Sequence, residues 1–173
     1  MIQQKKWARH ENCFQYRSDY IGLAKIDLLF LLAKLASEVL IPPMVHRELL
    51  GKIGSESGQI DKALKQFLQV RELPPLDPVI ETAIAGLDEG ERQVIGLAST
   101  MKENVLVLID DHAGREVAKT LNISFSGLVG ILLLAKEKGA LGKIRPVLDE
   151  LRAQGYWLSD KVIEVAKELS GEV

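Results

Sequence analysis

Apolar residues along this chain recur in two patterns: short uninterrupted runs, and longer segments in which they return every three or four positions. A short run rich in Val, Leu and Ile is typical of a strand buried on both faces of a parallel sheet, and the longer spacing is typical of a helix. The clearest run is VLVLID, at 105–110. Weaker candidates for strands lie at 13–19, 38–42, 69–73 and 123–127.

Helical periodicity fills the segments between these candidate strands. The segment at 21–36 is apolar almost all round and predicts one largely buried helix. Asp77 followed by Pro78 is the arrangement expected of a helix N-cap and first helical residue. Further helices are predicted at 44–52, 55–68, 77–86, 87–104, 113–122, 127–139, 144–155 and 159–170.

The alternation of strands and helices favours a parallel sheet with helices on both faces. We therefore predict an α/β fold, a three-layer α/β/α sandwich with a parallel sheet of about four or five strands. A chain of 173 residues is long enough for one domain with a proper core. We expect an N-terminal extension at 1–12 and a single domain at 13–173.

Composition and charge are those of an ordinary soluble protein, with 47% hydrophobic residues, 27% charged residues and a formal net charge of −2. Any polyanion would have to bind a local basic patch, because the chain has no global positive field. The one cysteine, Cys13, excludes an intramolecular disulfide and suits a reducing cytosol. Asp27, Lys34 and Glu38 interrupt the longest apolar stretch, so we expect a cytoplasmic protein without a membrane span.

Acidic residues gather where the predicted strands end. The clearest strand runs into Asp110 and Asp111, and sites in open α/β sheets lie beyond the carboxyl ends of the strands. Three other acids occupy comparable places in separate elements: Asp19, Glu48 and Glu91. Three or four carboxylates make an oxygen-ligand site for Mg²⁺ or Mn²⁺, and the ion offsets their mutual repulsion.

Each acid also has a purely structural interpretation. Glu91 in a first helical turn can interact with the helix dipole, and Asp110 can cap the helix that follows it. Glu48 can pair with a neighbouring basic residue at the surface, Asp111 can be solvated, and Asp19 can simply end a strand. The arrival of three acids at the expected ends of three different elements favours the metal site.

Several segments are similar to those of a known family. The chain resembles, over roughly residues 21–172, a PIN-domain subfamily of prokaryotes close to the VapC-type toxins. The resemblance implies a PIN-like α/β/α sandwich, dependence on Mg²⁺ or Mn²⁺, and cleavage of RNA. The segments that carry it are EVLIPPMVHREL, LDEGERQVIGLA, VLIDDHAGREVAKTLNISFSGLVGILLLAKEKG and GYWLSDKVIEVAKELSGE.

The resemblance also assigns roles to individual acids. Glu48 matches the second acid of the family and Glu91 the third, and either Asp110 or Asp111 matches the fourth, with Asp110 preferred. Asp19 is the one candidate for the first acid. The family usually opens with a short hydrophobic strand followed by Ser-Asp-Thr-Ser-Pro and then Leu-Ala-Lys. Here RSDYIGLAKID is about three residues shorter, so the position of Asp19 departs from the pattern.

These observations leave more than one function open. The first is a metal-dependent endoribonuclease that cleaves RNA, a toxin held in check by a small antitoxin and paired as a homodimer, with Arg115 steadying an acid or an RNA phosphate. The alternative is a catalytically impaired PIN-like domain that binds nucleic acid or a protein partner, which the altered link after Asp19 supports. A phosphate-accepting signalling domain is disfavoured, because its acid pair would close the first strand and not one near residue 110.

Overall fold

A sheet of five parallel strands lies at the centre of the protein, in the order β3-β2-β1-β4-β5. The structure is a computed structural model that describes residues 12–15, 17–51, 54, 56–101 and 104–172, with side chains from residue 20 onward. The α/β class predicted from the sequence is confirmed. The strands are β1 (Asn12–Gln15), β2 (Glu38–Ile41), β3 (Leu68–Val70), β4 (Val105–Leu108) and β5 (Ser124–Ser126).

Strand β4 has the doubly buried character that its apolar run predicts. It pairs with β1 on one side and β5 on the other, and Leu106, Val107 and Leu108 are all buried. The strand ends two residues earlier than predicted, although the amide of Ile109 still donates to the carbonyl of Ser126 at 2.8 Å. The two aspartates therefore leave the sheet directly after its last paired residue.

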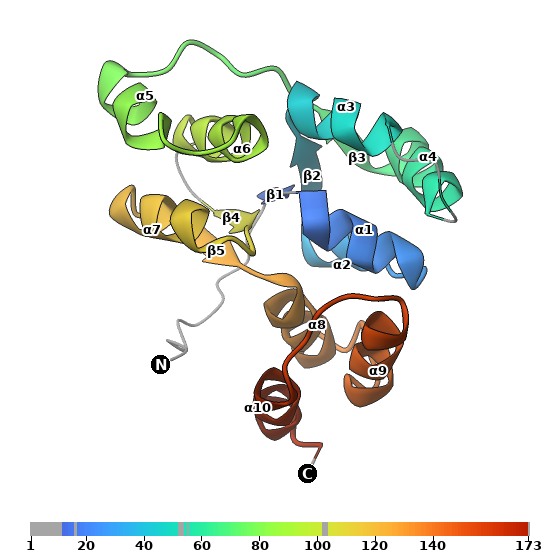
Figure 1. Cartoon of the computed structure of the whole chain (residues 1–173). Helices are drawn as coiled ribbons and strands as arrows, with labels where there is room; N and C mark the ends of the chain where they lie inside the picture. Colours follow the sequence, from blue (N-terminus) through green and yellow to red (C-terminus); the bar gives the residue numbers. More distant parts are fainter. Residues whose placement is uncertain (1–11, 16, 52–53, 55, 102–103, 173) are drawn as a thin grey trace.

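Helices lie on both sides of the sheet (Figure 1). Helix α6 packs on β1 and β4 from one side, with α5 and α7 beside it, and α2 packs on β2 and α8 from the other. The helices are α1 (Arg17–Lys25), α2 (Phe30–Leu35), α3 (Pro43–Leu50), α4 (Ser57–Gln66), α5 (Pro78–Ile84), α6 (Glu89–Ser99), α7 (His112–Thr120), α8 (Leu128–Glu137), α9 (Arg145–Ala153) and α10 (Asp160–Ser170).

The prediction of one continuous helix at 21–36 is wrong, because the segment folds as α1 and α2. Helix α1 ends at Lys25, and Asp27 adopts a left-handed backbone with φ 58°. The amide of Leu28 then donates back to the carbonyl of Leu23 at 2.8 Å, which closes the helix end in the manner of a Schellman turn. Hydrophobic periodicity missed this break because apolar residues continue through it on both sides.

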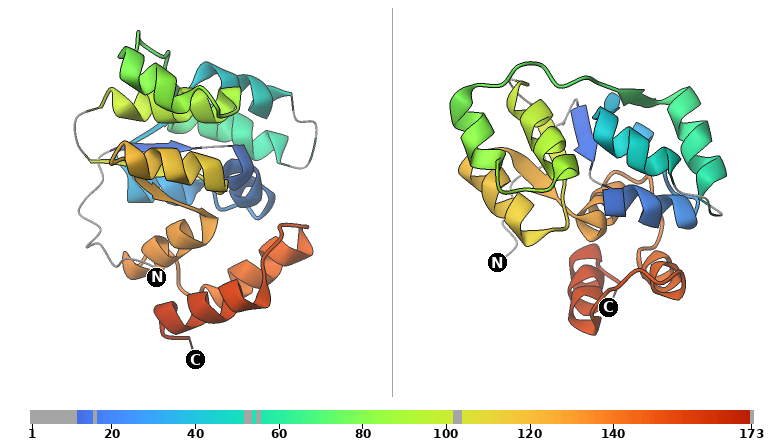
Figure 2. Two further views of the ribbon diagram at one scale, coloured as in Figure 1. Left: turned by 60° about the vertical axis from the view of Figure 1, so that its left-hand side comes forward. Right: turned by 45° about the horizontal axis from the view of Figure 1, so that its top comes forward.

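The last three helices form a layer outside the sheet. Helix α8 packs against α2, and α10 packs against α8 and α9. Both views of Figure 2 show α9 and α10 together at one end of the molecule. Among the helices that the structure describes, none combines the length and the apolar character needed to cross a bilayer.

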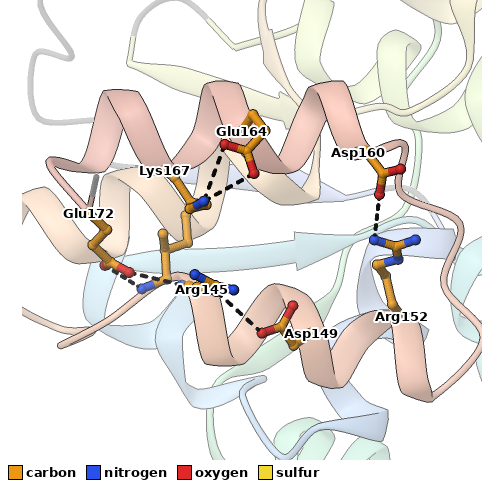
Figure 3. A network of polar contacts seen from close by, with 8 residues as sticks. Arg145, Asp149, Arg152, Asp160, Glu164, Lys167 and Glu172 are labelled. Carbon is orange, nitrogen blue, oxygen red and sulfur yellow. Dashed lines mark hydrogen bonds and ion pairs between the residues drawn. The ribbon is translucent and has the colours of Figure 1, made fainter.

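Glu172, just after α10, ties these three helices together (Figure 3). Its carboxylate pairs with Lys136 of α8 and accepts hydrogen bonds from the amides of Ile144, at 2.7 Å, and Arg145, at 3.1 Å. These amides begin α9, where backbone N–H groups have no partner within the helix. The bond from Lys136, followed by that from Ile144, lowers the pKa of Glu172 to about 2.

Replacing Glu172 by glutamine is expected to lower the thermal unfolding midpoint at pH 7. The lowered carboxyl pKa means that this stabilisation is complete above the ordinary value of 4.5 and is lost as the pH falls toward about 2. The difference in unfolding midpoint between Glu172→Gln and the wild type should therefore become smaller as the pH falls from 4.5 toward about 2. Thermal melts recorded at a series of pH values measure this difference. Asp149→Asn is the matched control, because Asp149 forms a mostly exposed pair with Arg145 and should change the midpoint little. An equal effect of the two substitutions would contradict this role for Glu172.

Candidate functional site

The order of the strands singles out one place on the sheet. The chain runs from β1 outward to β2 and β3, and then crosses back to form β4 on the other side of β1. The carboxyl ends of β1 and β4 are therefore a topological switch point, where open α/β sheets bind ligands. Asp110 and Asp111 follow β4 directly at this point.

Glu91 approaches the switch point from α6, the helix that packs on both β1 and β4. Asp88 caps this helix by accepting a hydrogen bond from the amide of Glu91 at 2.8 Å, so Glu91 lies in the first turn. Only 4% of Glu91 is exposed, and its Oε1 atom is buried without a hydrogen-bond partner among the described residues. An interaction with the helix dipole alone would leave the carboxylate in water, so it does not account for this burial.

The surroundings of Glu91 disfavour its negative charge. Burial, and after it the charges of Asp88 and Asp111, raise the pKa of Glu91 from 4.5 to about 7. Near neutral pH about half of the molecules would therefore carry a proton on this carboxyl group. A buried carboxylate with an unpaired oxygen and a second acid nearby is a donor set that suits a divalent cation.

Asp111 faces Glu91 across the start of α7. Its Oδ2 atom accepts hydrogen bonds from the amides of Ala113, at 2.6 Å, and Gly114, at 3.3 Å, so Asp111 is the N-cap of this helix. Gly114 lies between the two acids, because a Cβ atom added there would come within 2.8 Å of Glu91 Oε1. The absence of a side chain at Gly114 is what allows Glu91 to approach the capped end of α7. The cap is Asp111, and not Asp110 as one interpretation of the sequence had it.

Asp110 belongs to a different group of side chains. Its Oδ1 atom accepts a hydrogen bond from Arg115 at 3.1 Å, and its Oδ2 atom accepts one from the hydroxyl of Tyr156. Arg115 also donates through Nε to the carbonyl of Ile109 at 2.7 Å. Both oxygens of Asp110 are thus engaged in protein contacts, and Arg115 does contact an acid, as the sequence predicts. Its binding of an RNA phosphate stays a prediction.

Gly127, directly after β5, lies against the ion pair of Asp110 and Arg115. A Cβ atom there would come within 2.5 Å of Asp110 Oδ1 and 2.7 Å of an Arg115 guanidinium nitrogen. Gly127→Ala is expected to separate this ion pair and to destabilise the protein by about 1–3 kcal/mol, the usual cost of overpacking. Urea unfolding measures the change.

Gly142→Ala is the control for that substitution, because a Cβ atom at Gly142 meets no atom within 4 Å. It should leave the free energy of unfolding nearly unchanged. Equal free energies of unfolding for the two variants would contradict the prediction, because they would mean that Asp110 and Arg115 can move apart without destabilising the protein.

Glu48 and Asp19 lie on two helices that pack against each other, α3 and α1. Helix α3, which carries Glu48, packs on both α1 and α6, and the amide of Met44 donates to the side chain of Gln93 at 3.0 Å. One carboxylate oxygen of Glu48 is buried, so this residue is not the surface acid of the structural interpretation. Asp19 lies in the first turn of α1 and not at the end of β1, because only residue 16 separates this strand from the helix.

The convergence of the acids at one metal site stays a prediction. Glu91 and Asp111 lie together, whereas Asp110 is engaged by Arg115 and Tyr156. No group of three or more His, Cys, Asp or Glu residues within the described part of the chain is close enough to hold a metal ion. The side chain of Asp19 is outside the described part, so its position as a ligand stays a prediction.

Two participants are absent from the sequence-based expectation. Asp88 stands three residues before Glu91, and this Asp-x-x-Glu spacing is a capping signal that the pattern contains. Tyr156 is 46 residues from Asp110 and follows no spacing rule that links it to the site. Only the packing of the connection between α9 and α10 onto the sheet brings Tyr156 there.

Comparison with known proteins identifies the family of this chain. Residues 18–172 match a protein family described as a PIN domain. A search of curated proteins and a search of solved structures each find no match to this chain. The family match begins at the first residues of α1 and ends after α10, so it covers the acids of the site and all three C-terminal helices.

Proposed function

Because the chain belongs to the PIN domain family, whose members are generally nucleases, we propose that it is a metal-dependent endoribonuclease. The observation that carries the proposal is the buried carboxylate of Glu91 beside Asp111 at the switch point of the sheet. PIN domains typically use divalent metal ions, and paired carboxylates whose charges repel are stabilised by such an ion.

The residues that would hold Mg²⁺ or Mn²⁺ are Asp19, Glu48, Glu91 and Asp111. Asp111 is proposed in place of Asp110 because its charge lies close enough to Glu91 to raise the pKa of that carboxyl group, whereas both oxygens of Asp110 already have partners. The bound ion would supply Lewis acidity toward water and toward a phosphodiester oxygen. Its preference for oxygen ligands matches a set made of carboxylates.

The protein's own residues would then prepare the reaction. Without an ion, burial raises the pKa of Glu91 to about 7, so binding of the ion near neutral pH would release a proton from the molecules in which Glu91 is protonated. Arg115 is 39% exposed and carries a positive charge beside Asp110, so it can approach an RNA phosphate without leaving its ion pair. The N-termini of α6 and α7 add the positive ends of two helix dipoles at the same place.

We further propose a biological setting similar to that of the VapC-type toxins. In this setting the protein acts on RNA in the cytoplasm, as a homodimer, until a small antitoxin binds it. The support is the likeness of the four sequence segments quoted above, and the experiment is co-expression with the product of a neighbouring small gene. Growth arrest on expression alone, relieved by the second gene, is the result expected.

A catalytically impaired PIN domain that only binds nucleic acid or protein is the second candidate. It is favoured by the short link between β1 and α1, because a first acid inside a helical turn has less freedom to reach an ion. Mg²⁺ demands near-octahedral geometry, so a displaced ligand would weaken binding and lower activity. This candidate predicts RNA binding without cleavage.

Incubation of the purified protein with single-stranded RNA and increasing Mn²⁺ separates the two candidates. The first predicts cleavage that rises with Mn²⁺ and stops when EDTA is added. Binding of the RNA without cleavage at any Mn²⁺ concentration supports the second. Cleavage that persists in EDTA would overturn the metal site itself.

A further inference from the structure

The connection between α9 and α10, residues 154–159, lies against the candidate site. The hydroxyl of Tyr156 donates to Asp110, directly after β4, and the Tyr156 ring packs against Gly22 of α1. Figure 1 shows this connection passing over α8 on the side of α1. The connection is therefore part of the wall around the carboxyl end of the sheet.

The backbone of this connection is held at both ends. Gly155 has φ +84°, and the amides of Gly155 and Tyr156 donate to the carbonyls of Arg152, at 3.0 Å, and Leu151, at 2.9 Å. At the other end Ser159 caps α10 by accepting a hydrogen bond from the amide of Val162 at 3.3 Å. A segment fixed in this way presents its side chains in defined directions.

Trp157 stands between two neighbours that face the protein. Tyr156 reaches Asp110, and Leu158 is buried in the core, so the side chain between them is directed outward. Trp157 is 84% exposed, the most exposed of the large hydrophobic residues in the described part of the chain. An indole left in water forgoes the free energy of burying a large aromatic surface, so folding alone does not account for it.

We propose that Trp157 stacks on a base of the single-stranded RNA, next to the phosphodiester held at the acids. The proposal rests on the proposed ribonuclease function and names a residue that contacts its substrate. Aromatic side chains on a rigid backbone are the usual platform for unpaired bases, because every base has a π-face.

Two cationic side chains lie close to the connection that carries Trp157. Lys25, at the end of α1, reaches the carbonyl of Gln154 at 3.4 Å, and Arg115 is bonded to the same Asp110 that Tyr156 contacts. An RNA strand crossing the wall at Trp157 would thus have cationic groups for its phosphates and an indole for a base. Single-stranded RNA is favoured over duplex RNA, whose bases are already stacked on one another.

Fluorescence of the indole tests the contact without catalysis. The chain has two tryptophans, so a protein with Trp7→Phe reports Trp157 alone, and Glu91→Gln in the same protein prevents cleavage. A ten-nucleotide single-stranded RNA is expected to quench this emission. An abasic strand of the same length, which keeps the phosphates and lacks bases, should quench it much less. Equal quenching by both strands, or by neither, would overturn the proposal.

Steady-state kinetics then test whether Trp157 contributes to RNA binding or to the chemical step. Trp157→Ala is expected to raise KM for single-stranded RNA about tenfold, equivalent to about 1.4 kcal/mol, with little change in kcat. Trp157→Phe, which keeps a ring, should restore most of the affinity. Leu169→Ala, at the other end of α10 and 46% exposed, is the control and should leave KM unchanged.

The two assays separate this inference from the proposed function. Base-dependent quenching, combined with no RNA cleavage by the wild type at any Mn²⁺ concentration, supports the Trp157 contact and contradicts the nuclease. Metal-dependent cleavage with the same KM for Trp157→Ala supports the nuclease and overturns the contact. Quenching by duplex RNA that exceeds quenching by single-stranded RNA also overturns it.

Discussion

Replacing Glu91 by glutamine is expected to reduce metal-dependent RNA cleavage by at least about a hundredfold, more than the usual loss for a residue outside the ligand shell. Glutamine keeps the shape of the side chain and removes its charge, so the helix start at Asp88 should remain intact. The loss would follow because the buried carboxylate beside Asp111 is the donor that a divalent ion would use. Initial rates at saturating Mn²⁺ measure the change.

Glu89→Gln is the matched control for this experiment. Glu89 lies two residues away on the same helix, but it is half exposed and pairs with Arg92 at the surface. Its substitution should leave the cleavage rate close to that of the wild type. If Glu91→Gln retained full metal-dependent activity, Glu91 would not be a ligand.

The same Glu91→Gln substitution is expected to stabilise the metal-free protein at pH 8, by about 1–3 kcal/mol. In the wild type the carboxyl group must be charged at this pH although burial, Asp88 and Asp111 disfavour the charge. Glutamine removes that cost. Urea unfolding in EDTA measures the free energy of both proteins.

The stabilisation should depend on pH in a defined direction. With a pKa of about 7 in the folded protein and about 4.5 in the unfolded chain, the folded state binds more protons between these values. Wild-type stability therefore falls as pH rises through this window, and the advantage of glutamine should be small at pH 5 and full above pH 7. Added Mn²⁺ should reduce the difference in free energy of unfolding between Glu91→Gln and the wild type at pH 8, because the ion would stabilise the wild type. A glutamine variant that is less stable than the wild type at pH 8 would contradict the account.

The paired aspartates after β4 illustrate how neighbours in sequence can serve different purposes. Asp111 caps α7 and adds negative charge near Glu91. Asp110 accepts hydrogen bonds from Arg115 and from Tyr156, which lies between α9 and α10. Asp111 thus lies in the surroundings of Glu91, and Asp110 holds Tyr156, the neighbour of Trp157. Two adjacent negative charges repel each other, so neither stabilises the other. Asp111 is stabilised by amides of α7, and Asp110 by the side chains of Arg115 and Tyr156.

The pattern of the sequence was sufficient for the class of the fold and for the edge of the sheet at which Glu91 and the aspartate pair lie. An apolar run such as 105–108, followed by a helix, favours a strand inside a parallel sheet, and the alternation of strands with helices brings the carboxyl ends of the strands to one edge. Glu91 and the aspartate pair could be assigned to this edge for that reason. The break at Asp27 was missed because periodicity is blind to a left-handed residue within an apolar segment.

Tertiary structure alone decided which acids share an environment. Whether Asp110 or Asp111 approaches Glu91 depends on the direction in which each leaves β4 and on the room that Gly114 and Gly127 provide. Neither of these appears in residue spacing. The contact of Tyr156 with Asp110 spans 46 residues and exists because three helices, held together by Glu172, fold back onto the sheet. Local patterns determine elements, but contacts between distant elements depend on how the whole core packs, and for that reason only the folded chain shows them.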